Sequence, residues 1–173
     1  MRDHTKEVSA YLGAQNANSI GIINGYANGY GQTQQEVLIG SFLSAFTNKK
    51  VNDRSINPFN SAPLPNWTVN YNGLSKFEFM KKYVKNFVVR HAYSSSVSMS
   101  GVMSNLNAVS DANGHATARD LNDNFISFNN VQNITISERF SPLIGMLATW
   151  NILGKNITTN FEYKKDRQTT LSL

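Results

Sequence analysis

The sequence of 173 residues contains no cysteine, few charged residues and no long hydrophobic run. The absence of cysteine excludes a disulfide framework and a cysteine-ligated zinc site. Because no stretch of about 20 apolar residues exists, no transmembrane helix is predicted. The first thirteen residues, MRDHTKEVSAYLG, also lack the apolar core of a signal peptide. We therefore expect either a cytoplasmic protein or a start that is internal to a longer chain.

Asparagine, serine, threonine and glycine take the place of the missing charges. Charged residues amount to 16% of the chain and hydrophobic residues to 40%. This mixture is too uncharged for a typical disordered chain and too polar for a helical membrane protein. The net charge of +5 comes from scattered basic residues, apart from the pairs Lys49–Lys50, Lys81–Lys82 and Lys164–Lys165. We therefore expect no nucleic-acid partner.

Long alternating stretches dominate the second half of the sequence. Side chains of a strand point in turn to the two faces of a sheet, and residues 85–100, 131–150 and 156–173 all alternate. One face of the last stretch has no apolar residue: Asn156, Thr158, Asn160, Glu162, Lys164, Asp166, Gln168, Thr170 and Ser172. In each of the last two stretches the other face carries large apolar residues: Ile144, Met146 and Trp150 in the first, and Ile157, Phe161 and Tyr163 in the second. These patterns predict strands with one apolar band and one polar face.

The last two stretches are predicted to form one hairpin about the short turn at 151–156. Apolar residues oppose apolar residues when paired numbers sum to about 307, give or take two, as in the pair Met146–Phe161. Strands of soluble sandwiches usually have about 5–6 residues, whereas longer strands with one apolar band are typical of transmembrane barrels. Since the last strand, 156–173, has only one partner in the sequence, we predict a fragment of a larger barrel.

Helical patterns occur in the first half of the sequence. A capping box of Thr33 and Glu36 predicts a helix over residues 33–47, and a second box of Ser75 and Glu78 predicts a short helix. The apolar face of the first helix is expected to hold Val37, Leu38, Phe42, Ala45 and Phe46. The proline-containing residues 47–65 are predicted to be a loop.

We expect a mostly β fold with one or two short helices, as a segment of a very large transmembrane antiparallel barrel. Residues 1–65 would be a helix and loop segment in the lumen or at the rim, and residues 66–173 would be wall strands with a long loop at 102–130. Leu143 and Leu147 fall on the polar face, so we expect the first helix or a separate plug subunit to cover them.

No set of residues has the spacing of a catalytic or metal site. The histidines are isolated in the sequence: His4, His91 and His115. Glu138 and Glu162 lie on opposite faces in the predicted register, so they cannot form a glycosidase pair. Glu138 is instead expected to pair with Arg167, beyond the apolar band. We therefore expect no enzyme, no catalytic residue, no cofactor and no metal.

Five stretches of the sequence together point to a known family: GYGQTQQEVLIGSFLSAF, NPFNSAPLPNWTVNYNGLSK, FVVRHAYSSSVSMSG, ITISERFSPLIGMLATWN and NITTNFEYKKDRQTTLSL. In this order, over residues 25–173, they resemble the SprA/Sov family of outer-membrane translocons of the type IX secretion system in Bacteroidota. The sequence departs from that family at Gly40-Ser41, where Pro-Ala is common, and at Arg139, where glutamine is common.

The resemblance implies a function in protein transport across the cell outer membrane. It implies a barrel of about 36 strands, surrounded by outer-membrane lipid, through which secreted cargo proteins with a C-terminal sorting domain pass. A PorV-like shuttle would engage cargo at a lateral gate, a plug subunit would close the idle channel, and gliding species would deliver surface adhesins this way. It implies no catalytic residue.

Two other readings stay open from the residues themselves. A soluble β-rich, lectin-like surface module could bind carbohydrate through Trp67, Tyr71 and Tyr93, but it would bury the apolar band under a second sheet. A small complete porin would need at least about 8 strands, and the sequence offers five candidates at most.

In outer-membrane barrels short turns are periplasmic and long loops extracellular. Gly154 is therefore predicted to face the periplasm, and residues 111–115 the outside.

Overall fold

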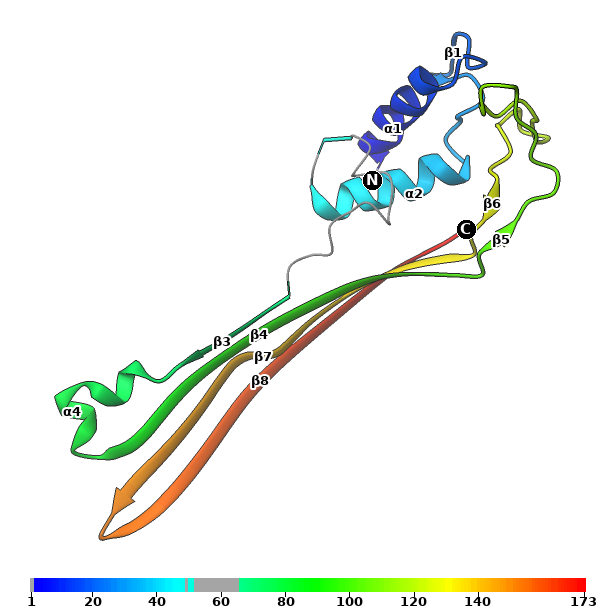
Figure 1. Cartoon of the computed structure of the whole chain (residues 1–173). Coiled ribbons are helices and arrows are strands. Elements are labelled where there is room, and N and C mark those ends of the chain that lie inside the picture. The colour runs from blue at the N-terminus through cyan, green and yellow to red at the C-terminus, as the bar shows by residue number, and fades with distance from the viewer. Residues whose placement is uncertain (1, 49, 52–65) are drawn as a thin grey trace. The chain divides into compact units, whose positions relative to one another are not determined.

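The computed structural model describes residues 2–48, 50, 51 and 66–173. This part is mostly β, with 46% strand, and contains three α-helices, so the mostly β class is confirmed (Figure 1). The chain divides into two units: unit 1 is Met1–Ala62, Val97–Thr135 and Thr170–Leu173, and unit 2 is Pro63–Ser96 and Ile136–Thr169.

No helix in the described part is long and apolar enough to cross a membrane. The loop predicted over residues 47–65 lies largely outside the described residues.

One antiparallel sheet contains the predicted strands. Its members are β3 (Trp67–Tyr71), β4 (Val84–Ser100), β7 (Asn133–Ile152) and β8 (Lys155–Ser172), in the order β3-β4-β7-β8 (Figure 1). Strand β3 pairs with β4 so that Trp67 lies opposite Tyr93 and Val69 opposite His91. The alternating stretches of the sequence are thus strands, with boundaries shifted by no more than two residues at most ends.

The hairpin of β7 and β8 turns at Leu153 and Gly154, whose φ angles are 52° and 78°. Positive φ at both central residues is the mark of a type I′ turn, which matches the twist of the flanking strands. Close to this turn, the hydroxyl oxygens of Thr149 and Thr158 lie 3.3 Å apart, and their numbers sum to 307. The predicted register holds here.

At the other end of the hairpin, Leu173 N–H donates to the carbonyl of Gln132 over 2.9 Å, and these numbers sum to 305. The register therefore stays within two of the predicted value. Strand β7 holds two more residues than β8 between these contacts, one more than the single extra residue of an ordinary β-bulge. Pro142, which has no N–H to donate, lies in that part of β7.

Helix α1 (Arg2–Gln15) was not predicted from the sequence. Its buried side chains recur at helical spacing, but two of them are polar: Thr5, Val8 and Ser9. The Ser9 hydroxyl donates to the carbonyl of Tyr30 over 2.6 Å and accepts from Ala27 N–H over 2.8 Å. Because partners far along the chain satisfy these hydroxyls, an apolar periodicity could not reveal the helix.

Helix α2 (Gln35–Thr47) confirms the predicted helix and corrects its cap. The N-cap is Gln34, not Thr33, since Gln34 Oε1 accepts from Val37 N–H over 2.9 Å. The buried face also differs from the predicted one: Val37, Ile39, Gly40, Ser41, Phe42, Leu43 and Ser44. Small residues lie inside because α2 packs against α1.

The second predicted capping box is wrong. Helix α4 (Glu78–Lys81) has Phe77 as its N-cap, and no side chain caps it. Ser75 belongs to the 3₁₀-helix η1 (Gly73–Lys76), and its hydroxyl donates to the carbonyl of Asn72 over 2.8 Å. The chain therefore forms two short helical turns in place of one capped helix.

The long loop after β4 contains two similar turns, nine residues apart. Asp111 Oδ1 accepts from the N–H groups of Asn113 and His115, over 2.9 and 3.0 Å. Asp120 Oδ1 accepts from those of Asn122 and Asn124, over 2.8 and 2.9 Å. Single β-bridges flank both turns, Ser110 with Ala116 and Arg119 with Phe125. The predicted long polar loop therefore contains a tandem pair of similar turns.

Short strand pairs complete unit 1. They are β1 (Ile22–Ile23) with β2 (Tyr26–Ala27), and β5 (Met103–Ser104) with β6 (Asn129–Asn130). The core of this unit consists of Val8, Tyr30, Val37 and Phe125, with the rings of Tyr30 and Phe125 in edge contact at 5.3 Å. The long loop thus contributes Phe125 to a core that the two helices build.

The predicted cover over Leu143 and Leu147 stays a prediction. Helix α2 belongs to unit 1, and the two leucines belong to unit 2.

Candidate functional site

The apolar face of the sheet in unit 2 is the candidate functional site. It comprises Trp67, Val69, Tyr71, Val89, His91, Tyr93, Phe140, Ile144, Met146, Trp150, Ile157, Phe161 and Tyr163. Cross-strand contacts identify its members: Trp150 Nε1–H donates to Thr159 Oγ1 over 3.0 Å. Even-numbered residues of β7 therefore share this face with odd-numbered residues of β8, as predicted.

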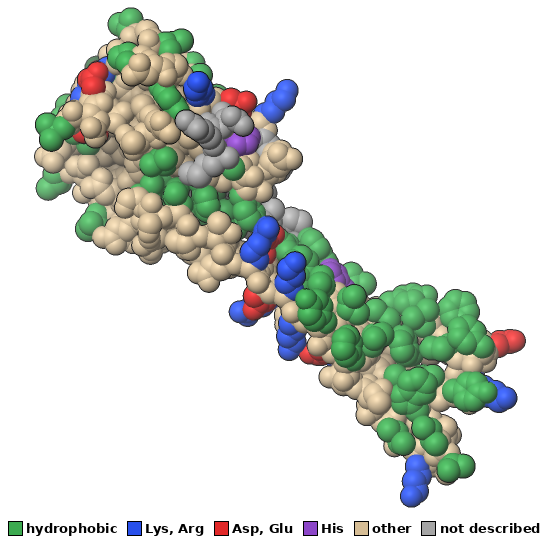
Figure 2. All heavy atoms as spheres, turned by 180° about the vertical axis from the view of Figure 1, so that it is seen from behind, with side chains coloured by type: hydrophobic (Ala, Val, Ile, Leu, Met, Phe, Trp, Pro, Cys, Tyr) green, Lys and Arg blue, Asp and Glu red, His purple; other side chains and the backbone are tan. Residues whose placement is uncertain are grey.

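Large apolar side chains on this face lie open in the described structure. Ile144 is 51% exposed, Ile157 48%, Phe161 55% and Tyr163 53%. Hydrophobic side chains gather over the strands of unit 2 (Figure 2). Soluble monomers rarely expose a contiguous apolar patch of more than a few hundred Å². A face of this kind needs a lipid or protein neighbour.

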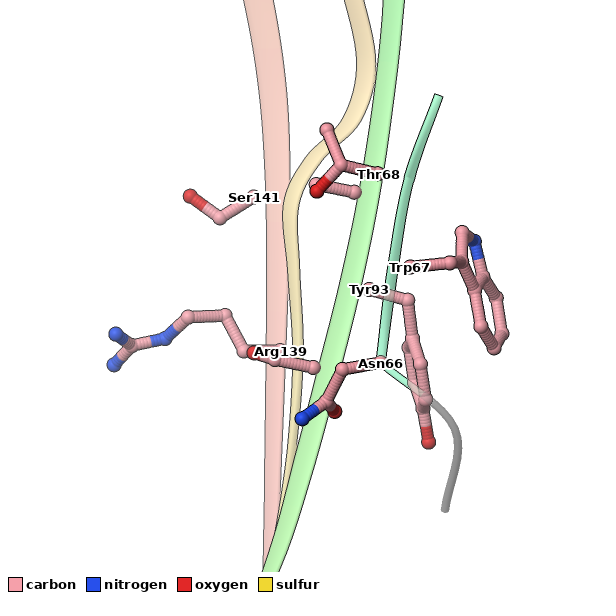
Figure 3. A pocket seen from close by; sticks show the side chains of 8 residues that line it. Asn66, Trp67, Thr68, Tyr93, Arg139 and Ser141 are labelled. Carbon is pink, nitrogen blue, oxygen red and sulfur yellow. The ribbon is translucent and has the colours of Figure 1, made fainter. Parts of the chain in front are cut away.

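The opposite face carries polar and charged side chains. Arg139 Nε lies 3.5 Å from a carboxylate oxygen of Asp166, and Lys164 Nζ lies 3.2 Å from one of Glu162. In Figure 3 the rings of Trp67 and Tyr93 lie on one side of the strands, whereas Arg139 and Ser141 extend to the other. The two faces of unit 2 therefore differ sharply in polarity.

Aromatic rings from three strands contact one another on the apolar face. The ring centroids of Trp67 and Tyr93 are 4.4 Å apart, and those of Tyr93 and Phe140 are 4.8 Å apart. His91 lies beside this cluster, 6.2 Å from Trp67. Ring pairs at these separations add about 0.5–1.5 kcal/mol beyond the burial of their area. The cluster thus joins β3, β4 and β7 near one end of the apolar band.

A chain of polar contacts lies next to the aromatic cluster. The Tyr93 hydroxyl donates to Glu138 Oε1 over 2.9 Å. Arg167 Nε–H donates to Glu138 Oε2 over 2.6 Å, and a second guanidinium nitrogen contacts the same oxygen. The predicted pair of Glu138 and Arg167 is confirmed. One carboxylate on β7 therefore accepts hydrogen bonds from a side chain of β4 and a side chain of β8, at the place where the apolar band ends.

The histidines take different roles in the two units. His91 Nδ1 lies 2.7 Å from the carbonyl oxygen of Leu143 and so links β4 to β7. His4 lies 3.6 Å from Glu7, and His115 lies 3.6 Å from Asp111. No three metal-ligating side chains form a group within the described ranges.

Sequence patterns found the apolar face but not its aromatic cluster. Alternation placed Trp67, His91 and Phe140 on apolar strand faces, yet the contact between β4 and β7 bridges a long loop. Because that loop is long, the sequence alone does not determine how β4 and β7 are aligned. The alternation that places Trp67 and Tyr93 on the apolar faces of their predicted strands was the only local signal.

Comparison of the chain with models of known protein families matches no family, and comparison with curated proteins finds no relative.

Proposed function

We propose that this chain forms part of the wall of an outer-membrane protein translocon, the channel of the type IX secretion system. The observation that carries the proposal is one sheet with an exposed apolar face and a polar opposite face. In a transmembrane barrel the first face meets lipid and the second meets the water-filled lumen. The resemblance to the SprA/Sov family supplies the identity of the channel.

Lipid is the neighbour that suits the apolar face best. Full burial of one large apolar side chain is worth about 1.5–3 kcal/mol, and many such side chains lie side by side here. Aromatic residues at both ends of the band, Trp150 at one and the Trp67–Tyr93 pair at the other, suit the interfaces of a bilayer. The Glu138–Arg167 pair then lies just beyond the hydrocarbon.

The polar face suits a lumen wide enough for folded proteins. Threonine, serine and paired charges on that face offer hydrogen bonds to water, and its two leucines, Leu143 and Leu147, are half-buried. Under the proposal, the passengers are secreted proteins with a C-terminal sorting domain, and the partners are a PorV-like shuttle and a plug subunit. Delivery of gliding adhesins would use the same channel. No catalytic step is part of this function.

The lectin-like alternative requires a second sheet over Ile144, Met146, Trp150, Ile157 and Phe161. Within the described residues of unit 2, no second sheet covers them. The aromatic residues that would bind sugar are also partly engaged, since Tyr93 is buried against Trp67 and Phe140. Membrane transport is therefore the better supported function.

Tryptophan fluorescence tests the lipid contact directly, because the only two tryptophans, Trp67 and Trp150, both lie on the apolar face. The chain is refolded into vesicles of phosphatidylcholine with brominated acyl chains, which quench nearby indole rings. We expect strong quenching of the native chain. A matched variant, Trp67→Phe with Trp150→Phe and Thr149→Trp, moves the only indole to the polar face and should escape quenching.

Equal quenching of the two proteins would refute the assignment of faces. Quenching by a soluble glycan, with none by brominated lipid, would instead favour the lectin-like function.

Transport itself is tested in the full-length protein within a cell that secretes a reporter carrying a C-terminal sorting domain. Phe161→Arg places a charge on the apolar face, which costs about 2–4 kcal/mol at the bilayer midplane, and should reduce secretion strongly. Thr158→Arg places the same charge on the polar face and should leave most secretion intact. The opposite ranking of the two variants would contradict the proposal.

A further inference from the structure

The connection between β3 and β4, together with the first two residues of β4, holds a concentration of positive charge. Residues 73–85, here named the basic aromatic segment, contain η1 and α4. Their charged residues are Lys76, Glu78, Lys81, Lys82 and Lys85. Four lysines against one glutamate give a charge of +3, which is more than half of the chain's +5.

These lysines are exposed, and none of the four forms an ion pair with another residue in the described part of the chain. Lys82 Nζ lies over the ring of Tyr83, 5.4 Å from its centroid. Three other basic side chains of unit 2 do have carboxylate partners: Arg139, Lys164 and Arg167. The segment therefore offers uncompensated cations to an external anion.

Aromatic side chains accompany the lysines on the surface. Phe77 is 51% exposed, Phe79 71% and Tyr83 58%. The rings of Phe77 and Phe79 stack on each other with centroids 6.0 Å apart. Exposed aromatic rings among lysines are typical of segments that lie in the interface between lipid hydrocarbon and water.

The segment lies at the turn end of the β7–β8 hairpin. Asn151 N–H donates to the carbonyl of Tyr83 over 3.3 Å, next to the turn at Leu153 and Gly154. Lys155, the first residue of β8, adds a further exposed cation close to this turn. The basic aromatic segment is thus continuous with the end of the apolar face that Trp150 marks.

We propose that the basic aromatic segment binds the headgroups of anionic phospholipids, with its aromatic rings inserted below the phosphates. Charge complementarity selects the anionic lipid, and continuity with the apolar face places the segment at the bilayer surface. Each lysine near an anionic surface contributes about 1 kcal/mol. This inference rests on the proposed function for the presence of a bilayer, but the preference for anionic lipid is a separate property.

A selective quenching experiment measures that preference. The reporter chain carries Phe79→Trp in a background of Trp67→Phe and Trp150→Phe. It is refolded into vesicles that always contain the same mixture of phosphatidylcholine and phosphatidylglycerol, with bromine either on one lipid or on the other. We expect the residue-79 indole to report about fivefold local enrichment of phosphatidylglycerol, the factor that about 1 kcal/mol represents.

Two variants of equal net charge separate the segment from overall charge. Replacement of Lys76, Lys81, Lys82 and Lys85 by glutamine should abolish the enrichment. Replacement of Lys6, Lys50, Lys164 and Lys165 by glutamine removes the same charge elsewhere and should preserve it. High salt should also weaken the enrichment of the unmodified segment.

Equal quenching by the two brominated lipids in the reporter chain would overturn the inference. So would an equal loss of enrichment in both lysine variants, since the effect would then belong to net charge. Failure of the proposed function would look different, because the native Trp67 and Trp150 would then escape quenching by either lipid. Selective binding of nucleic acid, with no lipid enrichment, would assign the cations to another ligand.

Discussion

Two ion pairs at the same level of the sheet differ in what surrounds them. The Glu138 side chain is 15% exposed and also accepts from Tyr93, whereas both members of the Arg139–Asp166 pair are more than 60% exposed. Water screens an open pair, so its contribution to stability is small. A shielded carboxylate that accepts from both Tyr93 and Arg167 matters more, because its loss removes two hydrogen bonds at once.

Glu138→Ala is therefore expected to lower the free energy of unfolding by about 1–2 kcal/mol. Asp166→Ala should change it by less than about 0.5 kcal/mol. Urea titration of the chain refolded in vesicles measures both values. Similar losses in the two variants would show that the Tyr93 contact adds nothing.

Asp111 offers a pH-dependent contact in the long loop. The side chain of Asn18 donates to its carboxylate over 2.9 Å, and this hydrogen bond, with those from the backbone N–H groups of His115 and Asn113, lowers the pKa of Asp111 below its usual value of 3.8. A carboxyl whose pKa is lowered on folding stabilises the fold above its unfolded pKa. That contribution is lost as the pH falls through the folded pKa.

Asn18→Ala removes the largest cause and should raise the pKa of Asp111 towards its usual value. Titration of the side-chain carboxyl by NMR measures the change. Asn122→Ala, in the second of the two similar turns, serves as the control and should leave the Asp111 titration unchanged. An unaltered pKa in Asn18→Ala would assign the shift to the backbone donors alone.

At the scale of the element, the start of α2 depends on a residue that local rules did not select. Gln34 is 3% exposed, and its Nε2 donates to the carbonyl of Phe125 and to the Ser127 hydroxyl, over 3.3 and 3.2 Å. The same side chain caps the helix and holds the long loop. Thr33, the residue of the predicted capping box, is exposed.

Gln34→Ala should lower the free energy of unfolding of unit 1 by about 1–3 kcal/mol, because it removes a cap and leaves buried groups unsatisfied. Thr33→Ala should have an effect of less than about 0.5 kcal/mol. Chemical denaturation followed by circular dichroism compares the two variants. A larger effect of Thr33→Ala would restore the capping box that the sequence predicts.

For the whole molecule, the lengths of the two kinds of connection predict which end would face outward under the proposed function. The β7–β8 turn is tight and the connection that carries Asp111 is long, so the first should be periplasmic and the second extracellular. The absence of cysteine makes single-cysteine variants specific. In intact cells, a membrane-impermeant maleimide should label full-length protein with Asn113→Cys and should not label protein with Gly154→Cys.

A label on residue 154 alone would reverse the orientation. Lysis of the cells before labelling is the control, since both variants should then react.

The sequence by itself determined the strands, their two faces and the β7–β8 hairpin. Alternation is a local property of a strand, and matching apolar bands permit few registers. The pair of Glu138 and Arg167 followed from that register without any further information. The tight turn at Gly154 connects the two strands in the same register.

Tertiary structure decided everything that depends on polar groups satisfied from afar. Helix α1 buries Thr5 and Ser9 because Tyr26, Ala27 and Tyr30 supply partners. The cap of α2 moved to Gln34 because residues more than 90 positions away in the sequence accept its amide. A buried polar side chain is stable only with such partners, and no local period records where the folded chain brings them together.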